Sequence, residues 1–235
     1  MKTLEAEVIV IGGGATGCGV LRDCTLRGID AILIEKNDIA SGTTGRNHGL
    51  LHSGARYAVR DLESATECIK ENRILKKIAW HCIEPTGGLF VTLPEDDPNY
   101  HNRLLEACRF AGIDAKEISV KKALSIEPNC NPNILSAIWV PDGTIDPFRL
   151  TSANILDSIE RGAHVFTHTQ VERIMLKQNQ VIGVQCYDKT AGEYLEIYAP
   201  IIVNASGVWG QHICKTAGIE LKMFPSKGSM VIIDY

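Results

Sequence analysis

The chain has 235 residues, of which 45% are hydrophobic and 22% charged, and its formal net charge at pH 7 is −4. This length allows one large domain or two small ones, and this composition is typical of a globular protein with an ordinary core. The slight acidic excess gives no electrostatic reason to expect nucleic acid as a partner, and an anionic substrate would need a local cluster of cations.

The N-terminal residues Met1–Glu7 carry one lysine and two glutamates and lead directly into an apolar run, which is not the pattern of a signal peptide. No apolar run approaches the roughly 20 residues needed to cross a bilayer. We therefore expect any membrane attachment to come through a partner protein or an exposed patch.

The first 35 residues predict a βαβ unit. We expect a buried strand over Glu7–Ile11, a Gly-rich turn, a helix over Gly17–Arg27 that Gly28 ends, and a second apolar strand over Ala31–Glu35.

The middle of the chain is predicted to be mostly helical. Ser41–Gly54 is rich in Gly, Ser, Thr and His and predicts a loop or extended segment over a ligand. Later segments have apolar residues at helical spacing, which predicts helices over Glu63–Cys82, Asn102–Ala111, Val120–Ser125 and Pro147–Arg161.

After Gly162 the pattern changes to short apolar runs separated by turn residues. These runs predict an antiparallel meander of Val165–Thr167, Val171–Leu176, Val181–Tyr187 and Tyr194–Tyr198. We then expect a buried strand over Ile201–Ala205, a helix over Gln211–Ala217 and a strand over Met230–Asp234. Because that last strand would lack a partner, we expect the 235 residues to be part of a longer protein.

The predicted fold class is α/β. A Rossmann-type sheet of Val8–Ile11, Ala31–Glu35 and Ile201–Ala205 would carry helical insertions and the antiparallel meander.

The glycines at 12, 14 and 17 form the Gly-x-Gly-x-x-Gly pattern of a dinucleotide-binding loop. Gly12 would make the tight turn, Gly14 would let the backbone approach a pyrophosphate, and Gly17 would let helix and strand pack closely. Glu35, 18 residues after Gly17, would accept hydrogen bonds from ribose hydroxyls. Its negative charge would repel the 2′-phosphate of NADP, so NADP is disfavoured. The pattern alone does not decide between FAD and NAD, and its alternative interpretation is a glycine-rich turn in some other α/β protein.

The eight cysteines include no Cys-x-x-Cys pair, which favours reduced core thiols over disulfides, zinc or an iron–sulfur cluster. Cys18, in the first turn of the predicted helix, is either a thiol of lowered pKa or a core residue, and we favour the core. His164 and His168 lie four apart in a strand-like run, which puts them about 13 Å apart. We therefore predict no metal site.

Three segments resemble FAD-dependent glycerol-3-phosphate dehydrogenases. They are the stretch after the second predicted strand, Ser41–Tyr57, and two shorter matches, Asp142–Arg149 and Asn204–Trp209. Glu84–Asp97 and Met223–Ser229 are similar to the large subunits of the anaerobic branch of that family.

This resemblance implies FAD as cofactor and the oxidation of sn-glycerol 3-phosphate to dihydroxyacetone phosphate, with electrons passing to a quinone. It implies a complex with two partners, namely a second subunit of flavoprotein type and a membrane-associated iron–sulfur subunit. The complex would lie at the cytoplasmic face of the inner membrane. The resemblance also implies an FAD-binding domain over residues 1–220, discontinuous in the family, and the start of an incomplete substrate-binding domain over residues 221–235.

The resemblance and the dinucleotide loop together assign a set of cofactor-binding residues. They lie in the loop, after the second strand, in the Ser41–Tyr57 stretch, in a strand near the adenine and in the turn that approaches the flavin: Gly12, Gly14, Ala15, Thr16, Gly17, Glu35, Lys36, Thr43, Thr44, His48, Gly49, Leu50, Leu51, Val171, Ala205 and Gly207.

The substrate site is assigned to the same stretch. Arg56 and Tyr57 match the pair that contacts the substrate phosphate in the aerobic relatives. Those relatives carry a His directly after a Lys-Gly-Ser-like turn, where this chain has Met230, so the role of that His is not carried over. The family's later part, with a further substrate-binding arginine and the last flavin-binding loop, lies beyond these residues, which leaves open whether the chain turns over alone.

Oxidising a secondary alcohol needs a base for the hydroxyl proton and cations for the phosphate. His52 is the candidate base because an unperturbed pKa of about 6.5 suits proton transfer near neutrality. Its alternative role is a hydrogen bond to the flavin or the backbone. Arg56 offers planar, bidentate donors or is an ordinary surface arginine. Tyr57 either donates one hydrogen bond to the phosphate or packs.

Two other functions remain open. One is an FAD amino-acid oxidase of the same fold, because the glycine loop is common to both enzymes. The other is a cofactor-binding module without turnover of its own.

Overall fold

The structure, a computed structural model, describes residues 2–231. The chain forms two compact units, each with its own hydrophobic core. The first unit contains the residues up to His48 and those from Pro147 onward, and the second unit is Gly49–Asp146.

The first unit carries the nucleotide-binding framework. Its elements in chain order are β1 (Lys2–Glu5), β2 (Val8–Ile11), α1 (Ala15–Leu26), β3 (Ala31–Ile34), the 3₁₀ turn η1 (Thr43–Arg46), α5 (Pro147–Glu160), β10 (His164–Phe166), β11 (Thr169–Lys177), β12 (Gln180–Asp188), β13 (Glu193–Tyr198), β14 (Ile201–Asn204), η3 (Gly207–Trp209) and α6 (Gly210–Thr216).

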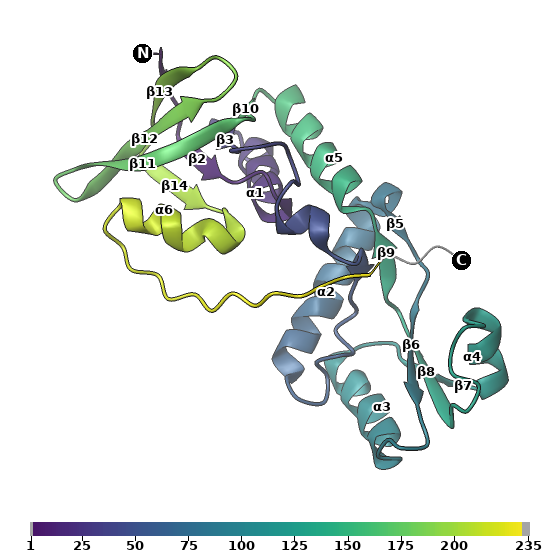
Figure 1. The fold of residues 1–235 in the computed structure, drawn as a ribbon. Helices are drawn as coiled ribbons and strands as arrows, with labels where there is room; N and C mark the ends of the chain where they lie inside the picture. The colour runs from purple at the N-terminus through teal and green to yellow at the C-terminus, as the bar shows by residue number, and fades with distance from the viewer. Residues whose placement is uncertain (1, 232–235) are drawn as a thin grey trace. The chain divides into compact units, whose positions relative to one another are not determined.

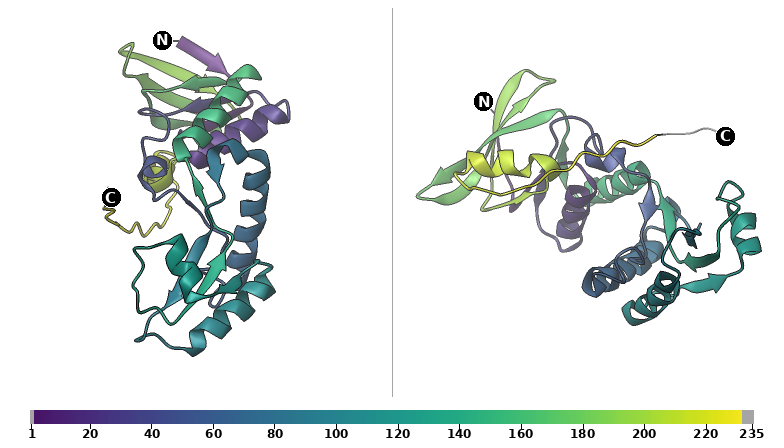
Figure 2. Two further views of the ribbon diagram at one scale, coloured as in Figure 1. Left: turned by 90° about the vertical axis from the view of Figure 1, so that its right-hand side faces the viewer. Right: turned by 60° about the horizontal axis from the view of Figure 1, so that its bottom comes forward.

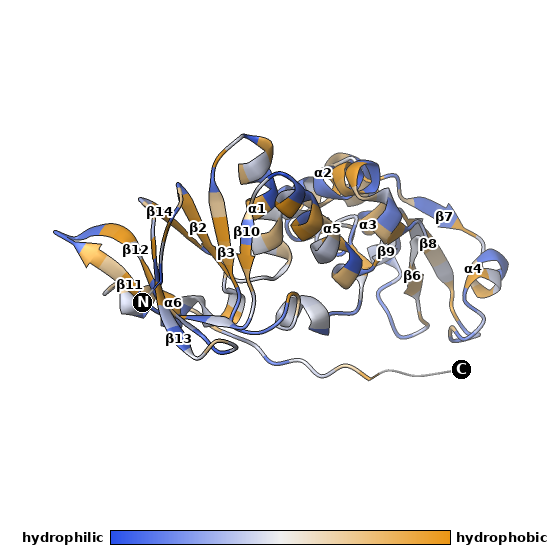
Figure 3. Ribbon diagram, turned by 90° about the horizontal axis from the view of Figure 1, so that it is seen from above, coloured by the Kyte–Doolittle hydropathy of each residue, from blue (hydrophilic) through white to orange (hydrophobic). Residues whose placement is uncertain are grey.

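A four-stranded sheet with the order β10-β3-β2-β14 forms the centre of this unit, and all its pairings are parallel. Every residue of β2 and β3 is buried, and Figure 3 shows the apolar colouring of both strands. Parallel strands covered on both faces are continuous apolar runs, which explains why the sequence identified them. The α/β class and the predicted sheet are confirmed.

The predicted meander is partly wrong. β11, β12 and β13 pair antiparallel as expected, and β1 joins them with the order β1-β13-β12-β11. The first predicted strand of the meander, Val165–Thr167, instead corresponds to β10, which pairs parallel with β3 at the edge of the central sheet. A run of three residues is too short for its apolar pattern to show which of the two sheets it joins. The strand lies in the central sheet because the chain returns to that sheet after α5.

Helices α1, α5 and α6 pack on the central sheet and its neighbour. α1 contacts both β2 and β3, and α5 lies beside α1 (Figure 1). α6 contacts β11 and β14 (Figure 2). After α6, residues 219–231 contain no helix or strand and form the extended yellow segment of Figure 1. Met230 and Val231 are therefore not in the strand predicted over Met230–Asp234, whose remainder lies outside the described residues.

The second unit contains two small sheets and three helices. Its elements are β4 (Leu50–Leu51), α2 (Leu62–Ile78), η2 (Trp80–Cys82), β5 (Ile83–Glu84), β6 (Gly88–Thr92), α3 (Asn99–Ala111), β7 (Lys116–Ile118), α4 (Val120–Ile126), β8 (Ser136–Val140) and β9 (Gly143–Ile145). The sheets have the orders β4-β9-β5 and β6-β8-β7, and both are antiparallel.

The predicted helices of this unit are present with shifted ends. α2 ends at Ile78 rather than at Cys82, because Ala79 leaves the helical conformation and the chain continues as η2. α3 begins at Asn99, three residues before the predicted start. The segment predicted as a loop over a ligand holds η1 and β4, and the two sheets of the second unit were not predicted.

Candidate functional site

The glycine loop connects β2 to α1 in a space that admits no larger side chains. A Cβ built on Gly17 would overlap the carbonyl oxygen of Gly12. A Cβ on Gly12, whose φ is +114°, would lie 2.5 Å from the carbonyl oxygen of Ala205. The backbones of the loop, of α1 and of the end of β14 therefore pack directly against one another with no side chain between them. This is the close packing predicted for Gly17.

A cavity of about 670 Å³ opens at this loop within the first unit. Its volume lies within the usual range for a cofactor site. It collects predicted cofactor residues from five separate chain segments: Gly12, Gly14, Ala15, Thr16, Glu35, Lys36, Thr43, Thr44, Val171, Ala205 and Gly207. Gly17 is buried behind the loop and does not line the cavity.

The N-terminus of α1 faces this cavity without a carboxylate. Gly14 caps the helix with no side-chain hydrogen bond, and the first turn has no acidic residue. The Thr44 hydroxyl accepts a hydrogen bond from the backbone N–H of Ala15 at 3.0 Å. Backbone N–H groups at a helix N-terminus and the helix dipole favour an anion, so this end of the cavity suits a pyrophosphate.

Glu35 lies at the carboxyl end of β3 and is held by backbone donors. Its Oε2 accepts from the N–H of Gly13 at 2.7 Å, and its Oε1 accepts from the N–H of Asn37 at 2.8 Å. An ionised carboxylate can accept about four hydrogen bonds, so both oxygens retain capacity for ribose hydroxyls. Because two backbone bonds hold this carboxylate in place, it presents that capacity to the cavity in one orientation.

Lys36 forms a contact that the sequence did not predict. Its Nζ lies 3.6 Å from the centre of the Trp209 ring, and both side chains line the cavity. A cation over an indole face is attracted by the ring quadrupole. The pair brings together the ends of two strands that are far apart in the chain.

Further lining residues were not assigned from the sequence. They are Ile11, Ile34, Asn37, Ser41, Gly42, Arg46, Thr169, Gln170, Ser206, Trp209, His212 and Ile213. Ser206 and Trp209 belong to the matched segment Asn204–Trp209, so that motif carried the signal. Thr169, Gln170 and His212 had no such signal, because their position depends on how the meander and α6 pack.

The remaining predicted residues have different surroundings. His48 is exposed in the first unit, and the other predicted residues of this stretch belong to the second unit. There, Leu50 and Leu51 form β4, His52 is half-buried, and Arg56 and Tyr57 are exposed. Met230 is 52% exposed.

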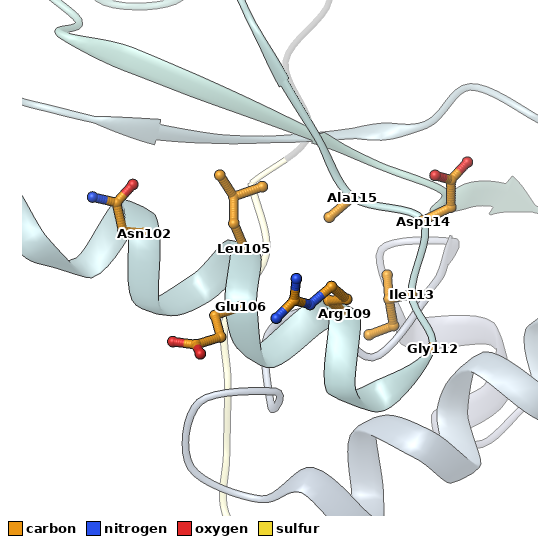
Figure 4. Close-up of a pocket in the computed structure, with 8 residues that line it drawn as sticks. All are labelled: Asn102, Leu105, Glu106, Arg109, Gly112, Ile113, Asp114 and Ala115. Atoms are coloured by element: carbon orange, nitrogen blue, oxygen red, sulfur yellow. The ribbon is translucent and has the colours of Figure 1, made fainter.

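A second cavity of about 580 Å³ lies in the second unit, beside α3 and the turn after it. Figure 4 shows Asn102, Arg109 and Asp114 among the side chains around it. It is open and contains no residue that the sequence assigned to a function.

Cys18 packs in the core rather than serving as a reactive thiol. Burial, with a contribution from the charge of Glu35, raises the pKa of Cys18 to about 12. Among residues 2–231, no group of three or more His, Cys, Asp and Glu side chains is placed to hold a metal ion. Within the same residues, no helix is both long and apolar enough to span a membrane.

The parallel sheet, the glycine loop at the helix N-terminus and the acid at the end of β3 define a dinucleotide-binding α/β protein. A family model described as FAD dependent oxidoreductase matches residues 7–235. The chain belongs to this family, and FAD is the cofactor that the family shares. The cavity fits FAD, because it offers N–H donors for a pyrophosphate, a carboxylate for a ribose and apolar walls.

Curated relatives with a high sequence identity to this chain are also known. One of them is a subunit of the anaerobic glycerol-3-phosphate dehydrogenase of Haemophilus influenzae, to which the chain is 54% identical over 100% of this chain and 42% of that protein. The chain therefore spans less than half the length of this curated relative.

Many solved structures have a similar fold. L-proline dehydrogenase from P. horikoshii has a TM-score of 0.75 and 28% identity over 94% of this chain and 57% of that chain. The glycerol-3-phosphate dehydrogenase from Bacillus halodurans, complexed with FAD, has a TM-score of 0.68 and 27% identity over 91% of this chain and 36% of that chain.

Proposed function

We propose that this chain forms the FAD-binding part of an enzyme that oxidises sn-glycerol 3-phosphate to dihydroxyacetone phosphate. The observation that carries this proposal is the 54% identity, over the whole chain, to a protein named as part of an anaerobic glycerol-3-phosphate dehydrogenase. The proposed FAD-binding domain comprises residues 1–220, and residues 221–235 begin a substrate-binding domain.

FAD, when bound, would supply the electron acceptor, and its N5 would be the acceptor for the substrate's C2 hydrogen as a hydride. The chain's own residues position the substrate and move its proton. Arg56 holds the phosphate through two parallel donors, and Tyr57 donates one hydrogen bond to the same group. His52 accepts the hydroxyl proton as the carbonyl forms. Among the proposed cofactor residues, His48, Gly49, Leu50 and Leu51 would hold the flavin.

We also propose that the electrons reach a quinone through partner subunits. The support is that the name of the similar relative describes one subunit of an enzyme, which implies further ones. One partner is a second subunit of flavoprotein type, and the other is a membrane-associated iron–sulfur subunit. The chain would then lie at the cytoplasmic face of the inner membrane, attached through these partners.

A second candidate is an FAD enzyme that oxidises an amino acid. The similarity to L-proline dehydrogenase, with a TM-score of 0.75, favours it. An amino acid carries no phosphate, so Arg56 and Tyr57 would then lack the phosphate partner proposed for them above. The third possibility is a cofactor-binding module without turnover, in keeping with a chain that spans less than half of its relative.

The first test is the visible absorption spectrum of the FAD-loaded chain before and after anaerobic addition of glycerol 3-phosphate. Bleaching of the flavin would support the proposed substrate. Bleaching by proline or another amino acid, but not by glycerol 3-phosphate, would support the second candidate. A spectrum that no substrate changes, while dithionite still bleaches it, would support a cofactor-binding module.

The role of Arg56 has a matched control four residues away. Arg60 is also exposed and lies on the same segment. We expect Arg56→Met to raise the glycerol 3-phosphate concentration for half-maximal bleaching at least about tenfold, because a lost charged hydrogen bond costs roughly 1.5–3 kcal/mol. Arg60→Met should leave it unchanged. Equal effects of both variants would exclude a specific phosphate contact at Arg56.

A further inference from the structure

A buried polar cluster in the second unit surrounds the segment that carries His52. We call it the loop clamp and define it as Asn72 and Lys76 on α2 together with Asp142. Asn72 is 1% exposed and Asp142 is 7% exposed, and Lys76 is half-buried. Polar side chains are seldom buried to this degree without a hydrogen-bonding task.

Asn72 bonds to backbone carbonyls on two chain segments. Its Nδ2 lies 3.2 Å from the oxygen of Leu51, 3.1 Å from that of His52 and 3.4 Å from that of Pro141. An amide has two N–H donors, so the three oxygens share them. One side chain thereby ties α2 to the residues around His52 and to the segment before β9.

Asp142 completes the clamp from the opposite edge. Its Oδ1 accepts from the backbone N–H of Ser53 at 2.6 Å in a buried hydrogen bond. Lys76 donates through Nζ to the carbonyl oxygens of Pro141 and Asp142, at 2.6 and 3.1 Å, and so holds the Asp142 segment itself.

The two contacts act on a single peptide group. The carbonyl of His52 and the N–H of Ser53 belong to one planar unit. Asn72 donates to the oxygen of this unit, and Asp142 accepts from its N–H. Both edges of the plane are therefore bound to buried side chains, which fixes ψ of His52 and so the direction in which its side chain leaves the backbone.

The residues after His52 are fixed as well. Gly54 has φ +91°, and a Cβ there would lie 2.5 Å from the carbonyl oxygen of Ala65 on α2. Ala55 and Ala58 are buried in the core of this unit. Arg56 and Tyr57, which lie between them, point outward from an anchored turn in which Tyr57 donates its N–H to the carbonyl of Gly54.

We propose that the loop clamp positions His52 for proton transfer, with Asn72 and Asp142 as positioning residues. This inference rests on the proposed role of His52 in the oxidation. Reactions that need aligned groups can lose about 10²-fold in rate when a group moves by about 1 Å. The clamp therefore acts on the rate of the chemical step, while the phosphate contacts of Arg56 act on substrate affinity.

The test compares Asn72→Leu, Asp142→Ala and Asp142→Asn with the control Ser136→Ala. Ser136 hydrogen-bonds to Thr92 and His101 in the same unit and does not touch the clamp. NMR on the FAD-loaded chain measures amide hydrogen exchange at Ser53 and the couplings that report χ1 of His52. The rate of flavin reduction by glycerol 3-phosphate is measured on the same samples.

We expect Asn72→Leu and Asp142→Ala to speed Ser53 exchange at least about tenfold and to average χ1 of His52 over several rotamers. Flavin reduction should slow by up to about 10²-fold, with the half-saturating substrate concentration changed less than about threefold. Asp142→Asn keeps an acceptor oxygen and should restore most of the protection. Asn72→Ser, which keeps one donor, replaces Asn72→Leu if the latter does not fold.

The inference is overturned if the clamp variants lower thermal stability like Ser136→Ala but leave Ser53 exchange and His52 χ1 unchanged. It is also overturned if His52 loses its fixed χ1 and flavin reduction keeps its rate. If glycerol 3-phosphate reduces the flavin neither in the original chain nor in any variant, the proposed function fails. The NMR measurements still decide in that case whether the clamp fixes His52.

Discussion

Two glycines in α1, only two residues apart, differ in whether a side chain would fit at their position. A Cβ at Gly17 would overlap the carbonyl oxygen of Gly12, whereas a Cβ at Gly19 meets nothing within 4 Å. We expect Gly17→Ala to lower thermal stability and abolish FAD binding. Gly19→Ala should raise the free energy of unfolding by about 0.5–1 kcal/mol, because alanine is the better helix former. Thermal melts and FAD titrations of both variants check this, and similar behaviour of the two would contradict it.

Three buried thiols make stability depend on alkaline pH. Burial raises the pKa of Cys18 and of Cys186 to about 12 and that of Cys108 to about 11, from an ordinary value of 9.0. Above that ordinary value the unfolded chain releases thiol protons that the folded chain keeps. The free energy of unfolding should therefore fall as pH rises from 9, by up to about 1.4 kcal/mol per pH unit for each thiol.

Urea unfolding at pH 7.5, 9 and 10 measures this slope. Cys186→Ala removes one buried thiol and should make the slope shallower. The control is Cys130→Ala, which removes a thiol at a half-buried position. A slope that stays the same when Cys18, Cys108 or Cys186 is replaced would assign the alkaline loss of stability to other groups.

At the scale of elements, an ion pair joins α1 to α5. Arg22 Nε lies 2.6 Å from Asp157 Oδ2, and Arg161 Nε lies 3.1 Å from Asp157 Oδ1. Burial opposes ionisation of Asp157, but the hydrogen bond from Arg22 and the charge of Arg161 outweigh it and lower the pKa of Asp157. A lowered pKa contributes stability above about pH 4, and this stability is lost as pH falls through the folded value.

We expect Asp157→Asn to reduce the free energy of unfolding at pH 7 by no more than about 1 kcal/mol, since the pair is partly exposed. The variant should also lose less stability than the original chain between pH 5 and 3. Asp23→Asn is the control, because its pair with Arg27 is exposed and lies within one helix. Denaturation at several pH values checks both variants, and an equal effect of the two would contradict a contribution from packing α1 on α5.

The sequence predicts some elements well for a physical reason. β2 and β3 are buried on both faces and are therefore continuous apolar runs. α1 follows a glycine pattern that the tight turn and the close packing of helix on strand require. β6 and β8 are runs of five residues, too short for periodicity to separate strand from helix. β1 is polar and exposed, and only its pairing with β13 makes it a strand.

The same limit applies to the site. The glycine loop and Glu35 are local in sequence, so their pattern revealed them. His212 and Thr169 line the cavity only because α6 and β11 pack there. Asn72 lies in the middle of a helix, and no local pattern shows that its amide bonds to the loop around His52.

At the scale of the whole molecule, cofactor binding should act on the two units differently. ADP carries only the pyrophosphate, ribose and adenine that the first-unit cavity fits. We expect ADP to slow amide exchange in the segments that line the first-unit cavity, the Gly12–Gly17 loop among them, and FAD to slow it also in residues 48–51. Hydrogen exchange by mass spectrometry measures both patterns. A free ligand concentration of about 100 times the Kd should raise the free energy of unfolding by about 2.7 kcal/mol. Identical patterns with ADP and FAD would contradict the proposed flavin contacts.

The two ends of the second unit lie side by side, since the N–H of Ile145 donates to the carbonyl of Gly49 at 2.7 Å. The matching breaks in the first unit are also neighbours, because η1 contacts α5 there. The 98 residues of Gly49–Asp146 thus form an insertion in an otherwise continuous nucleotide-binding chain. An insertion of this kind can be exchanged for another without rebuilding the glycine loop, so the two units can diverge in sequence at different rates.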